Sequence, residues 1–212
     1  MSRTNPFETM ADEYDAWFDH HPDLFESEVR AVRALLPPRG GLWVEIGVGT
    51  GRFASRLGIP LGVEPAQAMA VRATRRGVRV IQGRAESLPF PDGCADAAFF
   101  LTTLCFVDDV GLALREAHRI LRSRGVVVVA FFPRASPIGR QMAADPQDSF
   151  FRAARLLEAD ELRVRLAEAG FRVERMVQTL TRPGCEAVED PTEGSDCGSF
   201  VVVRARRAST ES

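Results

Sequence analysis

An apolar run that leads into three glycines at alternate positions constrains this chain most. The run spans residues 42–46, and the glycines are Gly47, Gly49 and Gly51. Residues 52–54 then resume a pattern that is compatible with a helix. We therefore predict a strand, a tight turn and a helix, which is the connection found at nucleotide-binding turns. Glycine suits such a turn because it tolerates positive φ and lets a ligand approach the backbone.

The spacing of the glycines and the charge beside them narrow the choice of ligand. A dinucleotide-binding turn has the pattern Gly-x-Gly-x-x-Gly, but this chain has Arg52 where the third glycine is expected. Glu45, before the first glycine, places a negative charge where a diphosphate would be repelled. A carboxylate suits a cationic ligand better. S-adenosylmethionine is such a ligand, because it carries a sulfonium and an ammonium group and no phosphate.

Three further motifs follow in order along the chain. Residues 61–64 form a short apolar run that ends in Glu64, where a carboxylate can accept hydrogen bonds from both hydroxyls of a ribose. Residues 65–69 open a helix, residues 80–90 give a third strand and a loop, and residues 95–103 give a fourth strand. The order of these motifs is far more specific than the glycines alone.

With these motifs the chain resembles the class I S-adenosylmethionine-dependent methyltransferases, and specifically the branch that includes ubiquinone/menaquinone-biosynthesis-type enzymes. The resemblance covers about residues 10–205. It implies S-adenosylmethionine as cofactor and a set of cofactor-binding residues. These are Glu45, Gly47, Gly49, Gly51, Glu64, Met69, Ala85, Glu86 and Thr102.

The resemblance also implies a role for most of these residues. The three glycines give backbone approach to the methionine moiety, and Glu45 meets its ammonium group directly or through water. Glu64 holds the ribose hydroxyls. Met69 packs on the adenine or belongs only to the core, and Ala85 and Glu86 occupy the adenine-recognition loop.

Arg84 is a departure from the pattern that the resemblance implies. Related enzymes often carry an aspartate before the alanine of this loop, which accepts a hydrogen bond from the adenine amino group. Arginine offers only donors. We therefore expect backbone groups and packing to recognise adenine, or Arg84 to point away from it.

Strands that alternate with helices predict the fold class. We expect an α/β, Rossmann-like fold with a seven-stranded, mostly parallel sheet, helices on both faces and an antiparallel last strand. The length of 212 residues predicts a single domain over residues 1–212, with its core at 41–205. The later elements are expected as a helix at 109–125, a strand at 126–132, an irregular stretch at 134–157, a helix at 160–169, a strand at 171–180, a loop at 182–198 and a strand at 199–205.

Residues 7–36 predict two amphipathic helices that are broken near Pro22. In the family that the chain resembles, such an N-terminal segment folds over the cofactor as a lid and helps to enclose the acceptor. Tyr14, Trp17 and Phe18 are also suited to fasten the segment to the sheet. Both interpretations can hold together, because a lid also needs an apolar underside.

Composition and charge exclude several classes of function. All 27 basic residues are arginines, so Schiff-base chemistry and a phosphate-binding loop lysine are excluded. A net charge of −2 and the lack of a basic stripe predict no nucleic-acid partner. The first fifteen residues lack a signal-peptide pattern, and the longest apolar run, 126–132, is too short to span a bilayer. We therefore expect no membrane partner and a cytoplasmic location.

The four cysteines show no metal-binding spacing. Cys94, Cys105, Cys185 and Cys197 form no Cys-x-x-Cys pair, so we predict free thiols and no metal site. Cys185 and Cys197 bracket one loop, and a disulfide or a shared metal there is the alternative. Cys105 follows the fourth strand near the expected methyl position, where we interpret it as a small buried residue rather than a reacting thiol.

The sequence does not identify a catalytic base. The weak candidates are Tyr14, His20 and His21 in the lid, with Asp19 beside them. His118 lies in the middle of a predicted helix, and we interpret it as structural. The position of the two lid histidines before a proline also fits a solvated helix end.

Acidic residues are abundant in the lid and in the 182–198 loop. They either steer a cationic or amine acceptor towards the site or form an ordinary solvated surface. These acids are Asp12, Glu13, Asp15, Asp19, Asp23, Glu26, Glu28, Glu186, Glu189, Asp190, Glu193 and Asp196.

We therefore predict an S-adenosylmethionine-dependent methyltransferase that acts on a small-molecule acceptor by in-line displacement, as a monomer or a homodimer. The first alternative is a non-catalytic module that binds S-adenosylmethionine or S-adenosylhomocysteine. The second is an NAD-type oxidoreductase, against which Arg52 and Glu45 argue.

Overall fold

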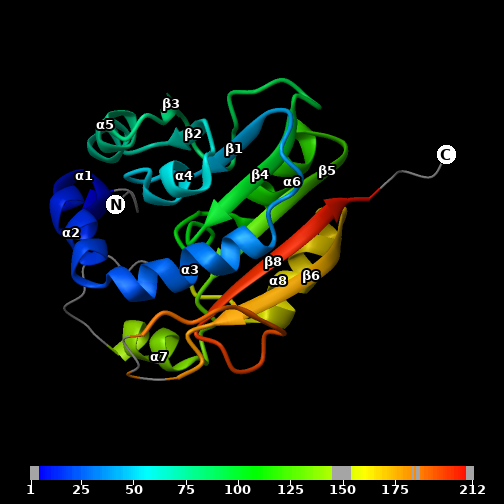
Figure 1. The fold of residues 1–212 in the computed structure, drawn as a ribbon. Helices are drawn as coiled ribbons and strands as arrows, with labels where there is room; N and C mark the ends of the chain where they lie inside the picture. The colour runs from blue at the N-terminus through cyan, green and yellow to red at the C-terminus, as the bar shows by residue number, and fades with distance from the viewer. Residues whose placement is uncertain (1–4, 145–153, 183, 185–186, 209–212) are drawn as a thin grey trace.

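The computed structural model describes residues 5–144, 154–182, 184 and 187–208, in which an eight-stranded sheet is flanked by helices (Figure 1). The strands are β1 (Trp43–Ile46), β2 (Leu61–Glu64), β3 (Arg79–Gln82), β4 (Ala95–Leu101), β5 (Leu121–Phe131), β6 (Phe171–Thr179), β7 (Thr192–Glu193) and β8 (Phe200–Arg207). The helices are α1 (Asn5–Thr9), α2 (Ala11–His20), α3 (Pro22–Ala34), α4 (Arg52–Leu57), α5 (Gln67–Arg75), α6 (Val110–Ile120), α7 (Pro137–Ala144) and α8 (Ala159–Glu168).

The strand order across the sheet is β3-β2-β1-β4-β5-β8-β6-β7. Strands β1 to β5 are parallel, because all four pairings among them are parallel. Strand β8 lies between β5 and β6 and is antiparallel to both. The predicted Rossmann-like α/β fold, with a mostly parallel sheet and an antiparallel last strand, is therefore confirmed.

The predicted number of seven strands is wrong, since the described part of the chain holds eight. The additional strand is β7, which is two residues long and pairs antiparallel with Val177 and Gln178 of β6. It lies within the stretch 182–198, which we expected to be a loop. A two-residue strand is too short to show alternation of apolar and polar side chains, so the local pattern gave no signal for it.

Each face of the sheet is covered by its own helices. Phe100 and Val129 pack with α6 and α8 on one face, whereas Phe99 and Val128 pack with α3 and α4 on the other. Figure 1 shows α3 running across the sheet on this second face. Neighbouring residues of a strand point to opposite faces, so strands covered on both sides have continuous apolar runs. This explains the composition of β4 and β5.

The predicted end of the 109–125 helix is wrong. Helix α6 ends at Ile120, and β5 begins at Leu121 without a loop. Leu121 is fully buried and pairs with Ala95 of β4. Tertiary pairing thus ends the helix before the arginines and Gly125, which suggested a later end.

The stretch 134–157, which we expected to be irregular, contains α7 in its described part. Pro137 is the first residue of α7, and the hydroxyl of Ser136 accepts a hydrogen bond from the backbone N–H of Gly139 at 3.0 Å. Serine before a helix and proline at its first position are recognised start signals. The Ser-Pro pair was therefore a sequence signal for this helix. Residues 145–153 lie outside the described residues.

The N-terminal segment forms three helices, α1 to α3, where we expected two. The predicted break near Pro22 is confirmed, because His21 separates α2 from α3 and Pro22 begins α3. The additional helix is the short α1. Its five residues are too few to show helical periodicity.

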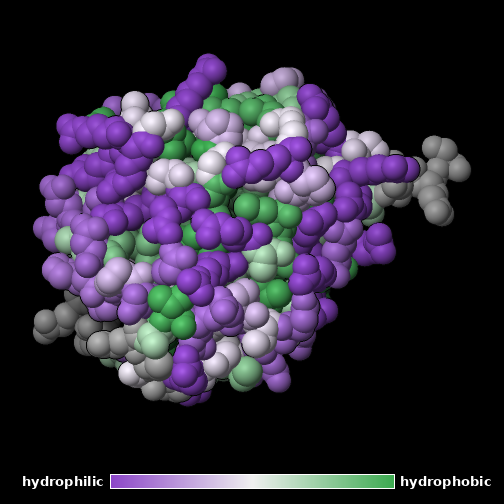
Figure 2. All heavy atoms as spheres, viewed as in Figure 1, coloured by the Kyte–Doolittle hydropathy of each residue, from purple (hydrophilic) through white to green (hydrophobic). Residues whose placement is uncertain are grey.

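The surface is mostly hydrophilic in the view of Figure 2, with hydrophobic residues in small separate groups. Among the described residues, the exposed large hydrophobic side chains are Trp17, Val71, Leu112 and Val164, which come from four different helices. No helix in the described ranges is long and apolar enough to cross a membrane.

Candidate functional site

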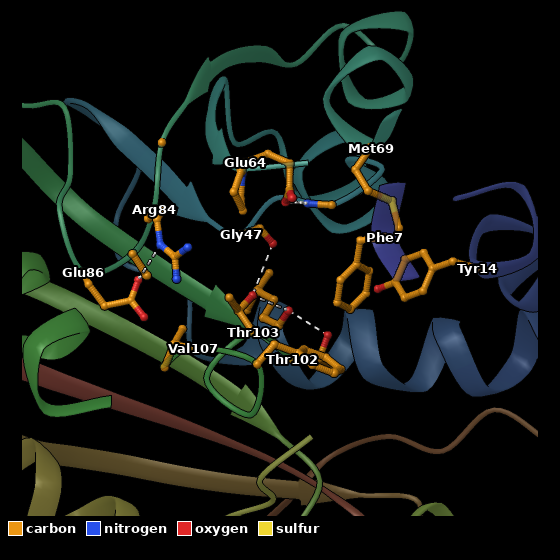
Figure 3. A pocket seen from close by; sticks show the side chains of 16 residues that line it. Phe7, Tyr14, Gly47, Glu64, Met69, Arg84, Glu86, Thr102, Thr103 and Val107 are labelled. Carbon is orange, nitrogen blue, oxygen red and sulfur yellow. Dashed lines mark hydrogen bonds and ion pairs between the residues drawn. The ribbon is translucent and has the colours of Figure 1, made fainter. Parts of the chain in front are cut away.

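A cavity lies beyond the carboxyl ends of β1, β2 and β4, where ligands bind in open parallel sheets. This first cavity holds ≈ 790 Å³ of empty space, counting the part open to solvent. Seven of the nine predicted cofactor-binding residues line it, namely Gly47, Gly49, Glu64, Met69, Ala85, Glu86 and Thr102. Figure 3 shows Gly47 and Glu64 between Arg84 and Glu86 on one side and Phe7, Tyr14 and Met69 on the other.

The glycine turn is held by the strand beside it. The backbone N–H groups of Gly47 and Val48 both donate to the carbonyl of Val63, at 2.8 and 3.0 Å. Gly47 and Gly49 have φ values of +72° and +53°, which L side chains rarely adopt. A Cβ built on Gly49 would meet nothing closer than Tyr14 at 4.0 Å, so the backbone there borders open space.

Gly51 has a different environment from the other two glycines. A Cβ at this position would lie 2.8 Å from the Cα of Ala73 in α5. Gly51 is not among the residues that line the first cavity. Its small size lets α5 pack against the start of α4.

Glu64 joins two turns at the floor of the first cavity. Its Oε2 accepts a hydrogen bond from Gly49 at 2.8 Å, and its Oε1 accepts one from the backbone of Ala66 at 3.0 Å. The side chain is 6% exposed, and burial raises its pKa to about 7 against the effect of these two bonds. Each oxygen retains a lone pair, so the carboxylate can still accept ligand hydroxyls.

Glu45 lies behind the glycine turn rather than on the cavity wall. It accepts a hydrogen bond from the backbone of Ala54, while its buried Oε2 has no partner among the described residues. Burial, and then the negative charge of Glu64, raise the pKa of Glu45 well above its usual range. The site thus holds two buried carboxyl groups near the turn, which favours a cationic ligand over a phosphate.

Arg84 lines the cavity, and its guanidinium contacts two acidic residues. Its guanidinium bonds to Asp108 at 2.5 Å and lies 3.7 Å from Glu86, as Figure 3 shows for the second pair. Glu86 in turn accepts from the backbone N–H of Asp108 at 2.7 Å, just before α6. The side chain of Arg84 is therefore tied to acids of the loop instead of being available to a phosphate.

Apolar groups close the opposite end of the first cavity. Met69 is fully buried and packs with Ala11 and Ala66 while also lining the cavity. Met69 therefore belongs to the core and also borders the cavity, and its packing on the adenine stays a prediction. Phe7 of α1, which we did not predict as a site residue, contacts the ring of Tyr14 at a centroid distance of 5.9 Å.

Thr102 follows β4 in a strained conformation. Its φ of +58° is unusual for a β-branched residue, and its N–H donates to Ala130 of β5 at 2.8 Å. Such strain persists only where the surroundings enforce it, and it is concentrated at functional sites. Thr102 lines the first cavity and also a second one beside it.

The second cavity lies between α2, α3, α7 and the loop after β4. It holds ≈ 1300 Å³ of empty space, again counting the part open to solvent. Tyr14, Thr102 and Phe106 line both cavities and so form the wall between them. Val107 carried no sequence signal for a site, because an apolar residue in such a position is usually core.

Glu28 projects into this second cavity from α3. It is 2% exposed, and its Oε1 has no hydrogen-bond partner in the part of the chain that the structure describes. Burial raises its pKa to about 8. The sequence did carry a signal for Glu28, because it shares a helix face with Phe25 and Val32, where a carboxylate is unexpected.

The weak catalytic candidates take different positions. Tyr14 stands between the two cavities, and burial, followed by the charges of Glu28 and Glu64, raises its pKa. His21 lines the second cavity and stacks on Trp17 at a centroid distance of 4.5 Å. His20 is exposed and lines neither cavity.

His118 and the cysteines are the remaining residues that the sequence singled out. His118 packs edge-on against Phe171, at 5.4 Å between ring centroids, away from both cavities. Cys105 is half-buried rather than buried and lines the second cavity, and desolvation raises its pKa to about 12, which disfavours the reactive thiolate. Cys94, Cys105 and Cys197 are free thiols. Cys185, and with it the proposed pair with Cys197, lies outside the described residues.

Most acidic residues of the lid pair with an arginine or accept hydrogen bonds from the N–H groups at the start of a helix. The carboxylate of Glu8 accepts from the first N–H groups of α5, at Gln67 and Ala68. Asp15 bonds to Arg52 at 2.8 Å and also to Arg76. Further pairs on the lid and the 182–198 loop are Asp12–Arg72, Asp19–Arg52, Glu26–Arg56, Glu189–Arg182, Asp190–Arg30 and Glu193–Arg175. Asp12, Asp15 and Asp19 thus fasten the lid to arginines of α4 and α5 and of the residue after α5, whereas Asp190–Arg30 joins the loop to α3. The acids are paired rather than simply solvated, and the steering of a cationic acceptor stays a prediction.

The first cavity fits S-adenosylmethionine on its own chemistry. Gly49 leaves backbone open to a ligand, Glu64 retains acceptors for hydroxyls, and the unpaired oxygen of Glu45 favours a nearby cation. Apolar walls at Met69 and Val107 can cover an adenine. Within the described ranges no cluster of three or more His, Cys, Asp or Glu residues is arranged to hold a metal ion.

Comparisons with known proteins agree with this site. A sequence profile described as "Methyltransferase domain" matches residues 44–129, which span β1 to most of β5. An uncharacterised protein of Methanocaldococcus jannaschii is 35% identical over 206 residues, which cover 96% of this chain and 99% of that protein. An O-methyltransferase of Aspergillus sclerotiorum is 28% identical over 180 residues, 77% of this chain and 68% of that protein.

Among solved structures, a protein of Thermotoga maritima superposes with a TM-score of 0.92 and 42% identity, covering 97% of this chain and 99% of that one. It is described as an S-adenosylmethionine-dependent methyltransferase, possibly a histamine N-methyltransferase. Because this likeness extends over nearly the whole of both chains, the chain belongs to the S-adenosylmethionine-dependent methyltransferases.

Proposed function

We propose that this protein transfers a methyl group from S-adenosylmethionine, bound in the first cavity, to a small organic molecule bound in the second. The observation that carries this proposal is the shared wall of Tyr14, Thr102 and Phe106. When bound, the cofactor supplies a methyl group on a positively charged sulfur, which is already activated for in-line displacement. The protein then accelerates the reaction mainly by holding donor and acceptor in line.

The residues of the first cavity divide among the parts of the cofactor. Glu64 accepts hydrogen bonds from the ribose hydroxyls, and the backbone at Gly47 and Gly49 meets the methionine moiety. Glu45 meets the ammonium group with its buried carboxyl group, directly or through water. Met69, Ala85, Glu86 and Thr102 line the remaining wall. Backbone groups and packing recognise adenine, because the donors of Arg84 are paired with acids.

The size and walls of the second cavity favour a small organic acceptor. Ligand cavities of small molecules commonly measure about 300–1,000 Å³, and the ≈ 1300 Å³ of the second cavity includes space that is open to solvent. The names of the relatives do not choose the acceptor atom, since one is an O-methyltransferase and another a possible histamine N-methyltransferase. The ubiquinone/menaquinone branch, a cytoplasmic location and a monomeric or homodimeric state stay predictions.

Thermal unfolding with and without S-adenosylhomocysteine tests the cofactor part of the proposal. A ligand at about a hundred times its dissociation constant adds roughly 2.7 kcal/mol of stability. For a domain of this size the unfolding temperature should rise by about 5–10 °C in the wild type. Glu64→Ala should abolish most of the rise, and NAD should give none. Absence of a rise with S-adenosylhomocysteine would contradict the proposal.

Turnover separates the proposed enzyme from a non-catalytic module. Wild-type protein incubated with labelled S-adenosylmethionine and a panel of amines, phenols and alcohols should transfer label to at least one class. A protein that binds the cofactor product tightly but labels no compound in the panel or in a cell extract favours the non-catalytic alternative.

A further inference from the structure

Glu28 stands out among the acids of the lid segment because it is buried while its Oε1 has no donor among the described residues. Most of the lid acids described above have an arginine or a helix N-terminus to pair with. Glu28 is buried on the inner face of α3, and its Oε1 contacts no donor among the described residues. Leaving a carboxyl group buried without a hydrogen bond costs stability. A ligand that supplies the missing donor would remove that cost.

The walls around Glu28 match a cation with an apolar body. Aromatic rings of Trp17, Phe53 and Phe132 line the same cavity. Such rings attract an ammonium group through their negative faces. The lining residues that the structure describes include no arginine, so no fixed positive charge competes for the carboxylate.

We propose that the methyl acceptor is a small organic amine and that Glu28 binds its nitrogen in the second cavity. This inference rests on the proposed function, because it names the acceptor class of the same site. The amine N–H donates to Oε1 of Glu28 in a charge-assisted hydrogen bond, and the carbon body packs on the aromatic walls. In its ionised form Glu28 repels a carboxylate-bearing acceptor, and a neutral alcohol gains less from it than an ammonium group does.

Glu28 can also accept the proton that the ammonium group must lose. A protonated amine has no free electron pair on nitrogen, so it cannot accept a methyl group. Proton transfer to Glu28 converts R–NH₃⁺ and the carboxylate into R–NH₂ and the neutral carboxylic acid, and charge and atoms balance. Burial raises the pKa of Glu28 to about 8, closer to that of an alkylammonium group than an ordinary carboxylate lies, which makes Glu28 a better general base. Tyr14 is unsuited, because its raised pKa keeps the phenol protonated.

Isothermal titration of the protein saturated with S-adenosylhomocysteine tests the inference without turnover. The probes are 2-phenylethylamine, hexylamine and histamine, each matched with the alcohol of the same carbon skeleton. We expect the wild type to bind at least one amine ten or more times tighter than its matched alcohol. Glu28→Gln should weaken that amine at least tenfold and leave the alcohol within about twofold.

Glu26→Gln is the matched control, because Glu26 lies on the same helix but pairs with Arg30 and Arg56 outside both cavities. It should leave the affinity for the amine unchanged. Equal S-adenosylhomocysteine affinity in all three proteins shows that the variants fold.

The pH dependence of binding separates a direct contact from a structural role. An alkylamine stays protonated between pH 6 and 8, so the ionised fraction of Glu28 should govern its affinity. The affinity of the wild type should rise by up to about tenfold per pH unit over this range, and that of Glu28→Gln should stay flat. The other titratable groups lining the cavity are Glu13, Tyr14, His21 and Cys105. A pH dependence that persists in Glu28→Gln belongs to one of them and overturns the inference.

The remaining outcomes are also decisive. If no amine binds better than its alcohol, or if Glu28→Gln binds the amine as tightly as the wild type, the inference is wrong while the proposed function stands. If the wild type fails to bind S-adenosylhomocysteine, the proposed function fails and the inference falls with it.

Discussion

The carboxylate of Glu64 accepts a hydrogen bond from the backbone N–H of Gly49, with 2.8 Å between Oε2 and the nitrogen. This bond joins the end of β2 to the glycine turn after β1. The second oxygen of Glu64 bonds to the backbone of Ala66 at 3.0 Å, so one side chain holds both turns at the cavity floor. Glu64 therefore shapes the first cavity in addition to its proposed contact with the ribose.

Replacing Glu64 should weaken the binding of S-adenosylhomocysteine. In Glu64→Gln, the amide NH₂ faces one of the two backbone N–H donors, so the turn loses an acceptor. We expect the dissociation constant for S-adenosylhomocysteine to rise at least tenfold, or about 1.4 kcal/mol, in a calorimetric titration. Glu174→Gln, which disrupts pairs with Arg204 and Arg206 on the far side of the sheet, is the control and should change it less than twofold. Equal effects of the two variants would refute the role of Glu64.

Gly49 and Gly51, the last two glycines of the turn, should respond differently to alanine. A Cβ on Gly49 enters open space, so Gly49→Ala costs only the strain of positive φ, about 1 kcal/mol. It should nevertheless weaken S-adenosylhomocysteine at least tenfold, because the Cβ occupies the ligand's approach. Gly51→Ala places a Cβ 2.8 Å from the Cα of Ala73 and should cost about 2–4 kcal/mol of stability. Urea unfolding and ligand titration together check this order, and the reverse order would contradict it.

The contribution of Asp15 to holding the lid on the core should be lost at acidic pH. Although burial opposes ionisation of Asp15, hydrogen bonds from Arg52 and Arg76 lower its pKa to about 2. A carboxyl group whose pKa is lowered in the folded state stabilises the protein above pH 4, and this contribution is lost as the pH falls through 2. Asp15→Asn should therefore cost about 1–2 kcal/mol at pH 7. The difference from the wild type should vanish near pH 2, as urea unfolding at several pH values would show.

Asp12→Asn is the control for Asp15→Asn, because it removes a more exposed ion pair of the lid. The Asp12 side chain is 88% exposed where it pairs with Arg72, so solvent screens the interaction. We expect a cost below about 0.5 kcal/mol. A larger cost for Asp12 than for Asp15 would show that the lid is not held through Arg52 and Arg76.

Glu28 should destabilise the free protein as the pH rises. Its pKa is about 8 in the folded protein and lies near 4.5 when unfolded, so the folded state binds the extra proton between these values. The stability of the wild type should therefore fall from pH 5 to pH 8 relative to Glu28→Gln. The difference should reach about 3–5 kcal/mol in favour of the variant above pH 8. Thermal or urea unfolding of both proteins without ligand measures it, and parallel pH profiles would refute the assignment.

Local signals in the sequence predicted the elements that depend on neighbouring residues. The side chain of Asp109 accepts from the N–H of Leu112 at 2.9 Å, as expected of a helix N-cap, because both groups lie within one turn. The glycine turn and Glu64 were likewise found from the strand–turn–helix pattern. Parallel strands bring their carboxyl ends to one edge, so the positions of these residues on the first cavity followed from the fold class.

Features that depend on distant partners could not be found in this way. The early start of β5 follows from the pairing of Leu121 with Ala95, and β7 exists only because β6 lies beside it. Gly49 and Gly51 are equivalent in the sequence, yet one borders open space and the other borders α5.

By itself the sequence determined the fold class, the cofactor turn and the acid at the end of β2, since each is encoded by residues close together in the chain. Only the tertiary structure decided which acids are paired. Asp15 finds Arg52 and Arg76 across the fold, whereas Glu28 lies against apolar side chains and finds no donor among the described residues. The cost of an unpaired buried charge depends on neighbours far apart in the sequence, and this is why the second cavity and its carboxylate emerge only once the chain is folded.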